Sequence, residues 1–144
     1  MVISEPQAGS PRTPLRWGRI ALAVVLIKLG VLVREIVLAF AFGLLAGGKF
    51  EDYAAFKMKN SGWLGPVFAG LLCFFASWWV AKGARGRQIL HGTVVGVVVL
   101  LIEIAFGARF RTWPDFLGEV GVVIGASWLG GWVAARRAAQ QQLS

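Results

Sequence analysis

The chain has 144 residues, of which 57% are hydrophobic and 15% are charged, whereas an average soluble domain has roughly 25% charged residues. This composition excludes an ordinary soluble domain and indicates one small membrane protein. Its 15 Lys and Arg residues outnumber 7 Asp and Glu residues and give a net charge of +8. Because the basic residues stand mainly at the ends of apolar runs, where they meet lipid headgroups, we expect no nucleic-acid partner.

Residues 1–18 are polar and rich in proline, a composition that cannot bury an apolar face. We predict a disordered cytoplasmic tail that closes with arginines around Trp17, a residue suited to the headgroup belt. A cleaved signal peptide is the alternative for this start. Against it, Lys28 interrupts the apolar run, which resumes to Leu45 and is longer than a normal signal core.

The first predicted span, residues 20–42, carries Lys28, Arg34 and Glu35. A charge at the centre of a membrane helix costs about 2.5 to 3.5 kcal/mol on insertion scales. Lys28 and Glu35 lie seven residues apart, so they share one helix face, which we expect to look into protein. The ammonium of Lys28 is also placed to extend toward the inner headgroups.

Residues 43–61 form the first predicted connector, in which Gly47 and Gly48 break the helix before a run of mixed charges. Tyr53 and Phe56 are spaced for one face of a short interfacial helix. We interpret the segment as a solvated connector outside the membrane, with a substrate-capping element as the alternative.

Two apolar runs, residues 63–81 and 89–106, flank a short basic link that contains Lys82, Arg85 and Arg87. Each run is long enough to cross a hydrocarbon core of about 30 Å. The pair therefore predicts a membrane hairpin, and the positive-inside rule places its link in the cytoplasm.

The fourth predicted span, residues 116–135, follows Asp115, which we expect to cap the helix, and ends at Arg136 and Arg137. Residues 138–144 form a short cytoplasmic tail. The sequence thus predicts an all-α membrane protein. Its architecture is a four-transmembrane-helix bundle over residues 19–137, with both termini in the cytoplasm.

Glycines along the third and fourth spans predict close contacts between helices, because a residue without a side chain lets two backbones approach. The main candidates are Gly92, Gly96, Gly121 and Gly125. These two spans contain more glycines than packing against one neighbouring helix requires. We therefore expect a homo-oligomer or an accessory subunit of a larger membrane complex.

Four ionisable residues are predicted to share a layer near the outer boundary: Arg34, Glu35, Glu103 and Glu119. With a rise of about 1.5 Å per residue, all four come within about 5 to 12 Å of that boundary. Because unpaired charges would be costly there, we predict that Arg34 pairs with Glu103 or Glu119 inside the bundle. One interpretation is a pair that fixes helix register, and the other is a proton-linked or ion-binding site.

The remaining polar residues offer little chemistry. Cys73 is the only cysteine and His91 the only histidine, which leaves no internal disulfide and no metal site of a usual ligand count. No serine has a His and Asp arrangement to activate it, so we expect no enzymatic activity and no cofactor. Contacts with lipid headgroups are predicted at Lys28, Lys82, Arg85, Arg87 and His91.

Two stretches of the chain are similar to each other and to a wider group of proteins. Ala-Ser-Trp at 76–78 and at 126–128 each close an inward-running span, which suggests either a duplicated two-helix unit or the usual ending of such spans. The sequences GGWVAARR at 130–137 and WVAK at 79–82, with the following His91-Gly92 and Gly96, resemble motifs of small bacterial four-helix membrane proteins of uncharacterised function. The resemblance covers about half of the chain and implies a four-helix fold in a bacterial inner membrane, with no particular chemistry.

These patterns favour a structural, assembly or accessory-subunit protein of the inner membrane, with lipids as its surroundings. The alternative is a small oligomeric transporter or channel that uses the charged layer as its site.

Overall fold

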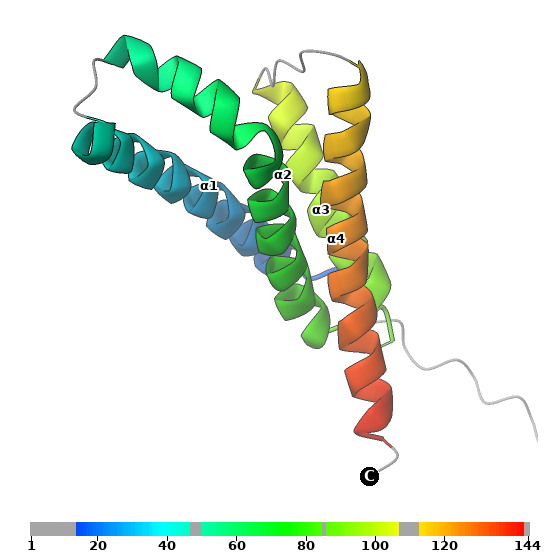
Figure 1. Cartoon of the computed structure of the whole chain (residues 1–144). Coiled ribbons are helices and arrows are strands. Elements are labelled where there is room, and N and C mark those ends of the chain that lie inside the picture. The colour runs from blue at the N-terminus through cyan, green and yellow to red at the C-terminus, as the bar shows by residue number, and fades with distance from the viewer. Residues whose placement is uncertain (1–13, 47–49, 85, 107–112, 143–144) are drawn as a thin grey trace, which may run out of the picture.

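Four helices make up the fold in a computed structural model, which describes residues 14–46, 50–84, 86–106 and 113–142. In chain order they are α1 (Trp17–Ala46), α2 (Phe50–Lys82), α3 (Gln88–Ala105) and α4 (Trp113–Gln140) (Figure 1). All regular secondary structure in the described residues is therefore helical, as predicted.

Three of the helices contain a stretch that is long and apolar enough to cross a membrane. The stretches are Gly65–Lys82, Gln88–Ala105 and Phe116–Gln140, and they match the second, third and fourth predicted spans. The first predicted span is not among them, since α1 carries Lys28, Arg34 and Glu35 within its apolar sequence.

The helices α2, α3 and α4 form the closely packed part of the molecule. Figure 1 shows them side by side, with α4 against both α2 and α3. In contrast, α1 packs against α2 and α3 and diverges from α3 and α4 as it runs upward in this view. Only the first half of α1 therefore belongs to the main core.

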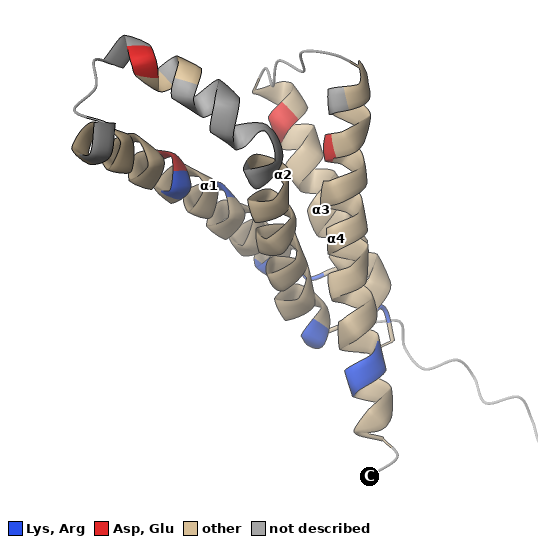
Figure 2. Cartoon of the chain, in the orientation of Figure 1, with Lys and Arg blue, Asp and Glu red and all other residues tan. Residues whose placement is uncertain are grey.

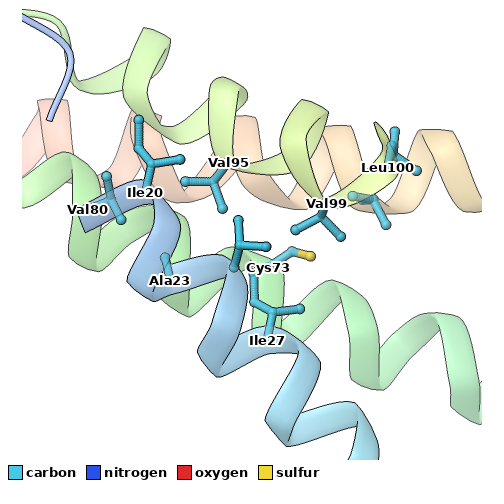
Figure 3. Packing of buried hydrophobic residues seen from close by; sticks show 10 residues of the cluster. Ile20, Ala23, Ile27, Cys73, Val80, Val95, Val99 and Leu100 are labelled. Carbon is cyan, nitrogen blue, oxygen red and sulfur yellow. The ribbon is translucent and has the colours of Figure 1, made fainter. Parts of the chain in front are cut away.

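The hydrophobic core lies where that first half of α1 meets α2 and α3 (Figure 3). Ile20, Ala23 and Ile27 recur every three to four residues, so they lie on one face of α1. They meet core residues of the other two helices, namely Cys73, Val80, Val95, Val99 and Leu100. Beyond Ile27, most large apolar side chains of α1 are exposed.

Glycines of α3 bring its backbone against α4. A Cβ built on Gly92 would lie 2.7 Å from the carbonyl oxygen of Ser127 and 2.9 Å from the backbone of Gly131. A Cβ on Gly96 would lie 2.7 Å from the Ser127 hydroxyl. No larger residue fits at Gly92 without moving a helix, so this pair sets the distance between α3 and α4.

The glycines of α4 divide into two groups. Gly130 packs against the backbone of α2 at Phe74, whereas a Cβ on Gly121 or Gly125 would have nothing within 4 Å. Gly121 and Gly125 therefore pack against no other helix of the same chain, and for the single chain the prediction is wrong. The reason is the helix face, because α4 turns its buried face, which includes Val123, toward α2 and α3.

The helix α2 is longer than the predicted second span and includes most of the predicted connector. It runs unbroken from Phe50, and Tyr53 packs on Phe42 of α1 with 5.5 Å between ring centroids, so this segment is not a solvated loop. The helix changes direction part-way (Figure 1) and contains Pro66, whose missing N–H and bulky ring bend helices. Gly47 and Gly48 lie outside the described residues.

The first residue of α4 also differs from the prediction. The helix α4 begins at Trp113, so Asp115 lies inside the first turn and is not the cap. Pro114 suits this position because the first N–H groups of a helix lack an internal partner. Between α2 and α3, Gly86 has a φ of 78°, a left-handed conformation that glycine adopts without strain.

Candidate functional site

An ion pair joins the middle of α1 to the last turn of α3. The ammonium Nζ of Lys28 donates a hydrogen bond to Oε1 of Glu103 at 2.7 Å. The side chains are 34% and 23% exposed, so both are partly buried. Lys28 directly follows Ile27, the last core residue of α1, and this packing carries the ammonium to α3. The prediction that Lys28 reaches the headgroups is therefore wrong.

Glu119 of α4 brings a second carboxyl group to this pair. It lies close enough to Glu103 and Lys28 for their charges to act on it. Oε2 of Glu103 is buried and has no hydrogen-bond partner among the described residues. Two ionised carboxylates cannot bond to each other, because both only accept hydrogen bonds. A hydrogen bond between the two carboxyls therefore requires one proton between them.

Arg34 does not join this cluster, and its predicted pairing with Glu103 or Glu119 is wrong. Its Nη1 lies 3.4 Å from Oε1 of the adjacent Glu35. The guanidinium also lies over the ring of Phe68 of α2, with 6.0 Å from Cζ to the ring centroid. Arg34 is thus held between its own helix and α2.

The predicted single layer of charge is therefore divided between two places. Lys28 takes the partner expected for Arg34, because α1 leaves α3 and α4 beyond its core residues (Figure 1). At Arg34 the helix next to α1 is α2. Gly65 of α2 leaves space for the guanidinium, whose Nη2 lies 3.5 Å from the position of a Cβ built on Gly65. A straight, parallel bundle would have placed all four charges together.

Small polar side chains line the inner faces of α2 and α4, a feature that the sequence interpretation missed. Cys73, Ser77 and Ser127 are fully buried, and the hydroxyl of Ser77 donates to the carbonyl of Gly92 at 3.3 Å. Ser127 packs directly on Gly96 of α3. The two serines occupy equivalent places in the Ala-Ser-Trp repeats, so the repeat marked the helix faces that meet α3.

Four described basic residues, Lys82, Arg87, Arg136 and Arg137, lie at one end of the molecule, and the described acidic residues lie toward the other end (Figure 2). Arg137 and Lys82 both lie on the ring of Trp78, at 5.2 and 5.8 Å from its centroid. Arg136 lies over Trp132 at 4.5 Å. Cations on indole faces near a helix end suit the headgroup level of a membrane.

His91 does not lie at the surface of this basic end, so its predicted headgroup contact is wrong. The side chain is fully buried on the inner face of α3, one turn before Val95. Its Nδ1 lies 2.9 Å from the carbonyl of Arg87 and must donate, because a carbonyl only accepts. Its Nε2 is buried without a hydrogen-bond partner among the described residues. Arg85 of the same link lies outside the described residues.

No family model, curated protein or solved structure matches the chain. In the described ranges, no group of three or more His, Cys, Asp or Glu side chains is placed to hold a metal ion. Lys28, Glu103 and Glu119 can neutralise one another inside an apolar setting, or they can hold and release a proton.

Proposed function

We propose that the chain is an integral membrane protein in which all four helices, including α1, lie in the bilayer. The observation that supports this most is the apolar outer surface. Large side chains such as Leu32, Ile36, Phe40, Leu101 and Leu117 are more than half exposed, and they occur along α1, α3 and α4. Soluble monomers rarely expose contiguous apolar patches of this extent, whereas lipid covers them without cost.

The ion pair accounts for the presence of charge in α1 in this proposal. Lys28 alone would make insertion of α1 costly, by about 2.5 to 3.5 kcal/mol near the bilayer centre. Its contact with Glu103 offsets part of that penalty, because each charge neutralises the other inside the apolar region. In this proposal α1 enters the membrane together with α3 as its partner.

The charge distribution supports an orientation as well. The end that carries Lys82, Arg136 and Arg137 would face the cytoplasm, since cytoplasmic flanks of membrane helices are enriched in Lys and Arg. Both termini would then lie in the cytoplasm, and a bacterial inner membrane is the location that we propose.

Within the membrane, we propose a structural, assembly or accessory-subunit role without catalysis. The charged residues of α1 are engaged in contacts that hold helices together, as Lys28 with Glu103 and Arg34 with Phe68 illustrate. The upper half of α1 and the open glycine face of α4 leave apolar surface for neighbouring membrane subunits or a second copy of the chain. This arrangement suits a protein that binds other helices.

The test is purification in a mild detergent, followed by determination of the particle mass and reconstitution of the same sample into liposomes. We expect a particle larger than one chain, destabilised by Glu103→Gln, and a proton flux in liposomes no greater than that of protein-free liposomes. Asp52→Asn is the matched control, because Asp52 is an exposed acid outside the apolar stretches. A monomeric particle that Glu103→Gln leaves unchanged would overturn the proposal.

One observation favours a second function, a small proton-linked transporter formed by an oligomer. Glu119 lies close to Glu103 and Lys28, and ionisable groups that meet inside a membrane can form a proton relay. This function predicts a pH-driven flux in liposomes that Glu119→Gln abolishes and Asp52→Asn does not. Equal flux in the parent and in Glu119→Gln would exclude it.

A further inference from the structure

The two arginines at the start of α1 meet over a glycine in the link between α2 and α3. A Cβ built on Gly83 would coincide with the guanidinium of Arg19, and it would lie 3.2 Å from Nη1 of Arg16. The two guanidinium groups are therefore close neighbours. Such an approach is possible only because residue 83 has no side chain.

Two like charges at this distance repel each other unless a negative group lies between them. In the described part of the chain, the ion pairs join Lys28 to Glu103 and Arg34 to Glu35, and neither Arg16 nor Arg19 takes part in one. The described acidic residues lie toward the other end of the molecule (Figure 2). Both arginine side chains are exposed, so an anion from outside the protein can reach them.

The aromatic surroundings of the pair suit a ligand at the membrane surface. Arg19 lies over the ring of Trp79, with 5.8 Å from Cζ to the centroid, and Trp79 is 40% exposed. This contact holds one face of the guanidinium and leaves its N–H edge available. Guanidinium edges bind phosphate oxygens with paired hydrogen bonds, which an ammonium does not.

A buried imidazole lies in the same layer. Ile20, Val80 and Val95 lie together in the core (Figure 3). One helical turn closer to the basic end, these three positions are followed by Arg16 on the first helix, Gly83 on the second and His91 on the third. His91 is fully buried, and its Nε2 has no partner among the described residues. Because it is fully buried, it is not part of the exposed site that the two arginines form.

We propose that Arg16 and Arg19, brought together over Gly83, form a binding site for a phosphate group. The phosphate of an anionic lipid headgroup and a free phosphate ion share this chemistry. The site is separate from the ion pair of Lys28 and Glu103. The proposal is therefore compatible with either function proposed above.

The test is native mass spectrometry of the detergent-solubilised full chain, titrated separately with phosphatidylglycerol, phosphatidylcholine and inorganic phosphate. We expect phosphatidylglycerol to bind most tightly. Each of Arg16→Gln and Arg19→Gln should weaken that binding about fivefold, which corresponds to about 1 kcal/mol per basic residue near anionic lipid. Binding of inorganic phosphate with the same sensitivity would identify a free ion as the ligand, and its failure to bind would identify the lipid.

Gly83→Ala gives the sharpest variant, because it displaces the Arg19 guanidinium without changing any charge. We expect it to weaken binding about as much as Arg19→Gln, since the Cβ meets the far end of a flexible side chain and the fold is kept. Gly18→Ala, which has nothing within 4 Å, and Arg136→Gln, which lies on Trp132, are the controls that should bind normally. Normal binding by Gly83→Ala, or an equal loss in Arg136→Gln, would overturn the proposal in favour of diffuse surface charge.

Discussion

Lys28 and Glu103 stand 75 residues apart in the sequence and are joined by a 2.7 Å hydrogen bond between Nζ and Oε1. This bond connects α1 to the packed unit of α2, α3 and α4. We predict that Glu103→Gln lowers stability by about 1 to 3 kcal/mol, because the ammonium of Lys28 then loses its charged partner. The measurement is reversible unfolding in mixed micelles, followed by circular dichroism.

A charge exchange provides the decisive control for this prediction. Lys28→Glu alone should be more destabilising than Glu103→Gln, because it places three carboxyls together. The double variant Lys28→Glu and Glu103→Lys should recover most of the lost stability. Arg34→Gln on the same helix should not interact with either change, since it lies in a different contact. Additive effects of the two exchanges would show that the pair contributes nothing.

Glu119→Gln should behave differently from Glu103→Gln, although both remove one carboxylate from the same cluster. An amide at position 119 can donate a hydrogen bond to the neighbouring carboxylate of Glu103, whose buried Oε2 has no hydrogen-bond partner among the described residues. We therefore expect stability to stay equal or to rise in Glu119→Gln. Unfolding in the same micelles measures this difference, and a loss as large as that of Glu103→Gln would contradict it.

The sequence predicted the helices better than the contacts between their charges. Residues 63–81, 89–106 and 116–135 were recognisable because each run is apolar and long enough to cross a membrane, and length does not depend on tertiary structure. The partner of Lys28 depends on how steeply α1 crosses its neighbours, and residue spacing along one helix does not determine that angle. Arg34 was assigned to the wrong glutamates for this reason.

The glycines of α3 and α4 also show that residue spacing does not predict which helix face is packed. Gly92 and Gly96 of α3 meet α4, whereas Gly121 and Gly125 of α4 face open space. The four-residue spacing of small residues is the same in both pairs. Which face of α4 turns inward is decided by Val123, Ser127 and Gly131 on its packed side, and glycine spacing alone does not reveal that face.

Substitution of these glycines gives a matched test of helix packing. Gly92→Ala should destabilise the protein, because the new Cβ would stand 2.7 Å from a backbone carbonyl of α4 that cannot move alone. Gly121→Ala should be neutral or stabilising by about 0.5 to 1 kcal/mol, because alanine favours the helix more than glycine does. Unfolding in micelles compares the two variants. A greater loss in Gly121→Ala would mean that another subunit packs on that face.

The proposed orientation can be measured with single cysteines in a background that lacks Cys73. Cys73→Ala should be tolerated, because the thiol is buried and alanine fits the space without a clash. Asp52 lies toward the acidic end of the molecule, and Gln142 follows α4 at the basic end. In intact spheroplasts, a membrane-impermeant maleimide should label Asp52→Cys and leave Gln142→Cys unlabelled until the membrane is opened. The positive-inside rule requires this order, because the basic end stays in the cytoplasm. The reverse order would invert the topology, and labelling of both positions before the membrane is opened would mean that the chain crosses it an even number of times between them.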